Sequence, residues 1–86
     1  MNWFDAQRFC LALGRRLSSA SQVENKVGWL GARKLRSGWT WLSGESVTAS
    51  IVENQNSTCL LRWLDLLHDH PCEHHLPVNE IRCDIS

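Results

Sequence analysis

Four cysteines in a chain of only 86 residues are the feature that most constrains this fold. They are Cys10, Cys59, Cys72 and Cys83, and none forms a Cys-x-x-Cys pair, so a zinc ribbon or a thioredoxin-like redox site has little support. A chain of this length buries only about 60–65% of its unfolded surface and usually needs an additional clamp. An even number of widely spaced cysteines suits two disulfides, for which three connectivities are open.

The remaining composition indicates an extracellular globular domain. An apolar fraction of 43% with five tryptophans supports a compact core, and nine basic residues balance nine acidic ones. This balance gives no reason to expect nucleic acid or an anionic membrane as partner. No run of 18 apolar residues is present, so no membrane insertion is expected. Asn56 opens the glycosylation acceptor Asn-Ser-Thr, which, beside an even cysteine count, favours a secreted or extracellular protein.

Apolar periodicity predicts two helices near the N-terminus. The first covers residues 3–13, with Asn2 as N-cap, Cys10 on the buried face and Gly14 as the stop signal. The second is short and is signalled by Ser21 and Glu24, which fit a capping box.

After the helices the apolar period changes to two, which predicts strands. Residues 38–44 place Trp39 and Trp41 on one face, and residues 47–51 alternate apolar with polar side chains. Residues 58–64 and 80–85 are two further candidate strands, each with a cysteine. Helices followed by antiparallel strands, without repeat or linker, predict a single α+β domain over residues 1–86.

The motifs, taken in order, resemble those of the C-type lectin-like domain. They are the first-helix motif WFDAQRFC at 3–10, the glycine-leucine turn at 14–20 followed by Glu24, the tryptophan-glycine strand at 29–32 and the WTWLSG segment at 39–44. The family's three later cysteines correspond to Cys59, Cys72 and Cys83, the last within IRCD. The resemblance covers almost the whole chain and implies two helices packed on small antiparallel sheets.

The resemblance also implies the pairing Cys10–Cys83 and Cys59–Cys72. In the chain-entropy model these bridges stabilise the fold by about 4.5 and 3 kcal/mol. The family usually has a strand before the first helix, and this chain begins at that helix. Either the domain is a compact variant or the strand comes from sequence outside the 86 residues.

The calcium site of the family is the main departure. Calcium-binding members carry a proline-containing acidic motif in a long loop and a tryptophan-asparagine-aspartate segment before the third cysteine. Here residues 52–58 contain no proline, and the second segment reads Leu67-His68-Asp69, so that Asp69 alone matches. Calcium takes six to eight oxygen ligands. We therefore expect no calcium and no calcium-dependent sugar binding of the family's kind.

All four histidines lie between residues 68 and 75. With Cys72 and Asp69 they form a candidate zinc set, although Pro71 and the tight spacing hinder a closed tetrahedral site. The favoured interpretation is a surface histidine cluster and no cofactor. A zinc site and a proton-sensitive contact that titrates near pH 6.5 are the alternatives. The four histidines are His68, His70, His74 and His75.

No enzyme is expected, because the serines lie in no nucleophile-elbow context and every cysteine has a use in a bridge. Trp3, Trp29, Trp39 and Trp41 fit core positions of the family. Trp63 is interpreted as core, with an exposed anchor for a partner as the alternative.

The favoured function is an extracellular binding module that recognises a protein or glycan without calcium. The ligand is expected on the segments between Glu53 and Leu76, where Arg62 and Asp69 are expected to be solvated. The alternative is a structural assembly domain of a larger extracellular complex, which packs against other chains. The candidate ligand-binding residues are Glu53, Asn54, Arg62, Trp63, His68, Asp69 and His70.

Overall fold

The structure, a computed structural model, describes residues 1–19 and 27–85. Its elements in chain order are α1 (Trp3–Ala12), β1 (Arg15–Leu17), β2 (Gly28–Leu35), β3 (Gly38–Trp41), β4 (Cys59–Trp63), β5 (Leu66–His70), the 3-10 helix η1 (Val78–Glu80) and β6 (Cys83–Ile85). Within these residues no helix has the length and apolar character needed to cross a membrane.

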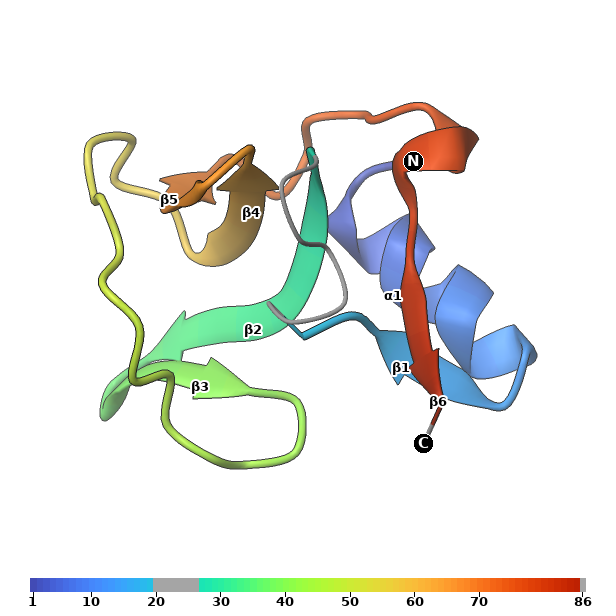
Figure 1. The fold of residues 1–86 in the computed structure, drawn as a ribbon, viewed down its shortest axis with the longest axis horizontal. Coiled ribbons are helices and arrows are strands. Elements are labelled where there is room, and N and C mark those ends of the chain that lie inside the picture. The colour runs from blue at the N-terminus through green and yellow to red at the C-terminus, as the bar shows by residue number, and fades with distance from the viewer. Residues whose placement is uncertain (20–26, 86) are drawn as a thin grey trace.

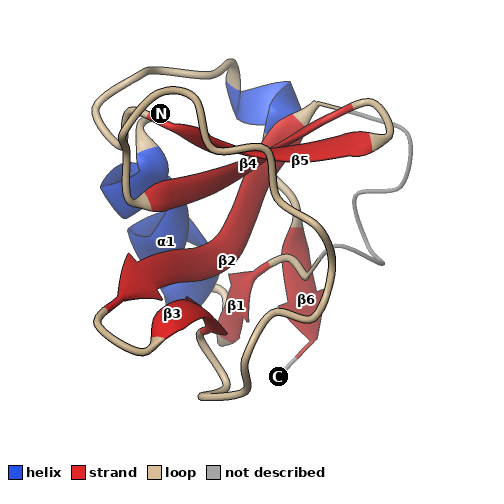
Figure 2. Ribbon diagram, turned by 90° about the vertical axis from the view of Figure 1, so that its left-hand side faces the viewer, coloured by secondary structure: helices blue, strands red, loops and turns tan. Residues whose placement is uncertain are grey.

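The strands form two antiparallel sheets. The larger has the order β3-β2-β4-β5, and the smaller pairs β1 with β6. Helix α1 lies beside the small sheet, while the β4–β5 hairpin projects on the other side of β2 (Figure 1). The view turned by 90° shows β2 running through the middle of the molecule, with a long loop from β3 to β4 (Figure 2). Strand β2 therefore connects the helical side of the domain to the hairpin.

The first predicted helix is confirmed. The Asn2 side-chain oxygen accepts a hydrogen bond from the Asp5 backbone N–H at 2.8 Å, which satisfies one of the free donors at the helix start. Trp3, Ala6 and Cys10 form the buried face. Gly14 follows with φ of +70°, in the left-handed region that favours glycine. The second predicted helix, signalled at residues 21–24, lies outside the described residues.

Two apolar clusters lie on opposite faces of β2. The larger joins α1 to the sheet through Trp3, Trp29 and Leu61. The smaller contains Leu30 and Ala32 of β2, and it consists of Leu30, Ala32, Leu60 and Leu67, with Trp39, Trp41, Val47 and Ile51 packed against it. Successive side chains of a strand point to opposite faces, so β2 contributes to both clusters. Of the four tryptophans predicted as core, Trp3 and Trp29 are buried and the other two are half-buried.

Gly31 of β2 has no room for a side chain. A Cβ at this position would lie 2.4 Å from the Leu17 carbonyl oxygen. The Gly31 N–H donates to Ser18 at 2.7 Å, and its carbonyl accepts from Leu42 at 2.8 Å. This close approach brings the segment after β1 against the larger sheet.

Both disulfides implied by the resemblance are confirmed. Cys10 and Cys83 have Cα atoms 5.5 Å apart and are separated by 73 residues, so this bridge ties α1 to β6. Cys59 and Cys72 have Cα atoms 5.3 Å apart and are separated by 13 residues. The second bridge ties the start of β4 to the segment that follows β5.

Some strand predictions need correction. The strand predicted at 47–51 is wrong, because this segment contains no strand and is flanked by single bridges from Ser46 to Thr40 and from Val52 to His68. Its alternating residues reflect two side chains, Val47 and Ile51, that pack into the smaller cluster. The predicted strand at 80–85 is shorter, since it begins at Cys83 after η1. Strands β1 and β5 were not predicted from alternation.

The two bridges are expected to contribute unequally to stability. Replacing Cys10 and Cys83 with alanine should lower the free energy of unfolding by about 4.5 kcal/mol, and replacing Cys59 and Cys72 by about 3 kcal/mol, because the unfolded chain gains more entropy when the longer loop is opened. Urea unfolding of the two double variants measures both values. Equal losses, or a larger loss for the shorter loop, would contradict the loop-entropy account.

Candidate functional site

One face of the β4–β5 hairpin forms the candidate site. Three cross-strand pairs follow one another along this face: Trp63 with Leu66, Leu61 with His68, and Cys59 with His70. Directly opposite residues of an antiparallel pair point to the same side. The hairpin face, defined by these six residues, therefore runs from an exposed end at Trp63 to a buried end at Cys59.

The loop before β4 runs alongside β5 and borders a groove next to this face. The Val52 N–H donates to Leu67 at 2.9 Å, and the Asp69 N–H donates to Val52 at 3.2 Å, so the loop is hydrogen-bonded to β5. The groove has a volume of about 360 Å³. Its lining is mostly apolar, with a few polar groups, and consists of Val52, Asn54, Gln55, Leu61, Trp63, Leu66, His68 and His70.

The interpretation of Trp63 as a core residue is wrong. Its side chain is 52% exposed, whereas Leu61, two residues earlier on the same face, is 2% exposed. The difference arises because Trp63 is the last residue of β4, where the hairpin extends beyond the larger cluster. Val52, Leu64 and Leu66 nearby are also about half exposed. The alternative, an exposed aromatic anchor, agrees with this position.

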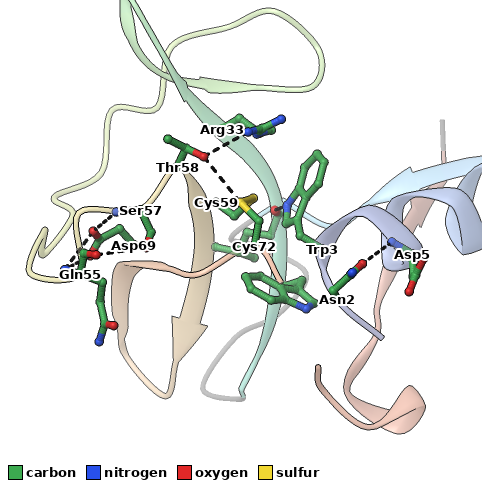
Figure 3. Close-up of a disulfide and its surroundings, with 12 residues drawn as sticks. Asn2, Trp3, Asp5, Arg33, Gln55, Ser57, Thr58, Cys59, Asp69 and Cys72 are labelled. Carbon is green, nitrogen blue, oxygen red and sulfur yellow. Dashed lines mark hydrogen bonds between the residues drawn. A yellow bond between two sulfur atoms is a disulfide. The ribbon is translucent and has the colours of Figure 1, made fainter. Parts of the chain in front are cut away.

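The Asp69 carboxylate fixes the loop behind the groove. One oxygen accepts backbone N–H groups from Asn54 at 3.0 Å and Gln55 at 3.1 Å, and the other accepts from Ser57 at 2.9 Å. Figure 3 shows Gln55 and Ser57 converging on this carboxylate. Three backbone donors on one charged acceptor hold the loop in a defined conformation.

Asp69 is 1% exposed, so the expectation that it is solvated is wrong. Burial alone would raise the pKa of its carboxyl group. The backbone N–H donors of Ser57, Asn54 and Gln55 together outweigh burial and hold the pKa below its ordinary value of 3.8. The sequence shows no partner for Asp69 because its partners are backbone groups, which every residue type carries.

Glu53 and Asn56 belong to a neighbouring polar pocket. The Lys34 ammonium lies 2.7 Å from the Glu53 carboxylate, which also accepts the Trp39 indole N–H at 2.6 Å. The lysine first and then the indole lower the pKa of Glu53. This pocket of about 510 Å³ is lined by Lys34, Glu53, Asn54, Asn56, Ser57, Thr58 and Asp69.

Three histidine rings lie close together, and two of them, His68 and His70, line the groove. The ring centroids of His68 and His70 are 5.6 Å apart, and those of His70 and His74 are 4.6 Å apart. His70 also meets the edge of Trp29 at 5.6 Å. His68 and His70 lie on the same face of β5.

The zinc set proposed from the sequence is not brought together. Cys72 is in a disulfide, and Asp69 points to the loop. Across residues 1–19 and 27–85, no three histidine, cysteine or acidic side chains are arranged to hold a metal ion.

The structure thus brings together four of the seven candidate ligand residues, Asn54, Trp63, His68 and His70, in the groove. Asp69 supports the loop, and Glu53 lies in the polar pocket. Arg62 is on the opposite face of β4, where its Nε donates to the Leu64 carbonyl at 2.8 Å.

Sequence reasoning missed Val52, Gln55, Leu61 and Leu66 as lining residues. Recognition of the Leu64-Asp65 turn would have revealed Leu66, because it pairs with Trp63 directly across the hairpin.

Comparison with known proteins identifies the fold. No protein-family model and no curated protein matches the chain. Among solved structures, the Kupffer cell C-type lectin receptor Clec4f, solved as a trimer, matches with a TM-score of 0.60 and 16% identity over 85% of this chain and 66% of that chain. The Ca²⁺-dependent type II antifreeze protein, in its Ca²⁺-free form, matches with a TM-score of 0.65 and 23% identity over 86% of this chain and 78% of that chain.

The chain therefore has the C-type lectin-like fold, as its sequence motifs indicated, with two disulfides. The match spans about two thirds of the lectin receptor chain. At these identities the similarity establishes the fold.

The Asp69 carboxylate is expected to stabilise the domain through its charge. Asp69→Asn should lower the free energy of unfolding at pH 7 by about 2–3 kcal/mol, because the amide loses the charge and directs a donor at backbone donors. The carboxyl pKa is lowered in the folded state, so its contribution is complete above pH 3.8 and is lost as the pH falls through the folded-state pKa.

Urea unfolding at pH 7 and at about pH 3 measures both effects. Asp65→Asn, at an exposed position of the same hairpin, is the matched control and should change little. An Asp69→Asn deficit that persists undiminished at the acidic pH would show that charge is not the cause.

Proposed function

We propose that this lectin-like domain is a binding module that recognises a protein or glycan ligand without calcium through the groove on the hairpin face. The observation that carries the proposal is the half-exposed Trp63 in the lining of a mostly apolar groove. Ligand sites in proteins are typically concave and apolar, with a few polar groups that fix orientation. Asn54, Gln55 and His68 are the polar groups here.

The lining favours a protein ligand over a free glycan. Val52, Trp63 and Leu66 are each about half exposed around one groove, so an apolar side chain of a partner would bury all three. Tryptophan is enriched among residues that dominate binding energy at protein interfaces. A glycan would use Trp63 as a stacking surface and rely on the polar groups for its hydroxyls.

Calcium independence rests on Asp69. In this chain its two carboxylate oxygens accept three backbone N–H groups, so the loop acquires its conformation from the protein itself. A calcium ion would need six to eight oxygen ligands, and it would compete with these donors for the Asp69 carboxylate. We propose that the module needs no metal or other cofactor.

We place the protein outside the cell. Two disulfides persist in oxidising compartments and are rare in the cytosol. Asn56 is exposed within its acceptor sequence. It lines the polar pocket and is not part of the groove lining, so a glycan on Asn56 would leave the groove open.

We also propose that the domain performs binding and no catalysis. All four cysteines are bridged, which removes every thiol nucleophile. The two solved structures named above are a lectin receptor and an antifreeze protein, and neither name is that of an enzyme.

Assembly with other chains is the second candidate function. Helix α1 and the residue after it expose Phe4, Phe9, Leu11 and Leu13, whose side chains are between 37% and 57% exposed. Such residues could pack against another chain of a larger complex. Analytical ultracentrifugation distinguishes the two functions, because a recognition module should remain monomeric at micromolar concentration, whereas an assembly domain should self-associate or co-assemble.

Trp63→Ala is expected to weaken ligand binding by about thirtyfold, since a tryptophan at the centre of an interface contributes roughly 2 kcal/mol or more. Ligands would be selected on arrays of glycans and extracellular proteins, and affinities measured with and without EDTA, which should have no effect. Leu35→Ala, similarly exposed at the end of β2, is the control. Equal affinity of the Trp63 and Leu35 variants would exclude the groove as the binding site.

Asn56 is expected to carry one N-linked glycan when the protein is secreted from eukaryotic cells. Mass spectrometry before and after enzymatic deglycosylation should show a loss of a single glycan, and Asn56→Gln should lack it. Ligand affinity should be the same in both forms, because the acceptor lies outside the groove. A glycan that blocks binding would mean that the polar pocket contributes to the ligand site.

A further inference from the structure

His70 is a titratable side chain placed where water cannot reach its nitrogens. Both ring nitrogens are buried, and neither has a hydrogen-bond partner. The ring lies between the edge of Trp29 and the rings of His68 and His74. A neutral imidazole tolerates this environment better than an imidazolium ion, which needs solvent or acceptors for two N–H groups.

The charged groups around His70 also disfavour its protonation. Burial first, and then the neighbouring His74 and His68, lower the pKa of His70 below its ordinary value of 6.5, while Asp69 opposes them. On β4, His70 pairs with Cys59, which is in a disulfide, and on β2 its neighbour is Trp29. Neither of these side chains titrates. Among the described residues, these groups are the ones that act on the imidazole.

His70 is also part of the groove lining. Among the lining residues, His68 and His70 are the only titratable side chains, and there is no lysine, arginine, aspartate or glutamate. At neutral pH the groove therefore suits an uncharged, apolar segment of a protein partner. Such a segment would further shield the His70 end of the groove from water.

We infer that the groove binds an apolar segment of a protein partner at neutral pH and releases it on mild acidification, with the imidazole of His70 as the sensor. This inference rests on the proposed function and adds the chemistry and the regulation of the same site. An apolar occupant favours the neutral ring, so by linkage protonation weakens binding. For one proton, the affinity falls by up to about tenfold for each pH unit below the titration of the unoccupied protein.

The stability of the domain should also depend on the protonation of His70 when the groove is empty. The folded-state pKa of His70 is lowered, so the unfolded chain binds the proton more readily. The stabilising contribution of the neutral ring is complete above pH 6.5 and is lost as the pH falls through that value towards the folded-state pKa. Acidification from pH 7.5 to 5.5 should therefore lower the melting temperature, and a non-titrating ring should remove most of this change.

The test uses Nile red, an uncharged apolar dye, as the probe for the groove. Its affinity is measured by fluorescence at pH 7.5 and 5.5 for the wild type, Trp63→Ala, His70→Phe and a control, His75→Gln. The control histidine is exposed and outside the groove. Near-UV circular dichroism at both pH values confirms that each protein is folded. His70→Phe keeps an aromatic ring and breaks no hydrogen bond, because the ring nitrogens of His70 have no partner. His70→Leu is a second variant in case the phenyl ring does not fit.

The wild type and His75→Gln should lose more than twofold in affinity at pH 5.5, while His70→Phe or His70→Leu should lose less than twofold. Dye binding that depends on Trp63 but is equal at the two pH values would overturn the pH sensor and leave the groove in place. A pH dependence that survives in both His70 variants would overturn the assignment to His70. Absence of Trp63-dependent dye binding at pH 7.5 would overturn the proposed groove, and the sensor with it.

Discussion

The Cys59–Cys72 bridge is the constraint on which the candidate site depends. It lies in the larger apolar cluster with Trp3 and Trp29, and it closes the ends of the β4–β5 hairpin around 13 residues. The Trp3 N–H donates to the Cys72 carbonyl at 3.0 Å, so the same point anchors the start of α1. The Thr58 hydroxyl, which contacts the Cys72 sulfur at 3.5 Å, also accepts a hydrogen bond from Arg33 (Figure 3). The hairpin thus has a fixed root, and its outer end can extend into solvent.

The loop that borders the groove is fixed in a different way. No apolar residue between Glu53 and Thr58 is available to pack it, because the segment reads ENQNST. Its backbone donors converge on Asp69, which lies on β5 next to the histidines. A buried carboxylate with three donors is costly to disturb. This arrangement holds a polar loop in one conformation without a core of its own.

Sequence reasoning predicted the elements whose signals are local. The helix at Trp3–Ala12 has a capping side chain, an apolar face and a terminal glycine, and each is readable from neighbouring residues. Strand β5 was missed because its turn, Leu64-Asp65, lacks the asparagine or glycine that two-residue hairpin turns usually carry. Leu64 nevertheless adopts φ of +58°. The disulfide pairing came from the family motifs, since the residues alone left three connectivities open.

The exposed tryptophan is best explained by its neighbours on the hairpin face. A single exposed apolar side chain is common on protein surfaces and needs no function. Trp63, however, shares a groove with Val52 and Leu66, which are similarly exposed, while Leu61 on the same strand face is part of the core. The strand that presents Trp63 to solvent is therefore anchored in the core by Leu61, two positions earlier. A tryptophan side chain has only two rotatable bonds, so beside a preformed groove it loses little conformational entropy on binding, which is the physical reason to expect recognition at this face.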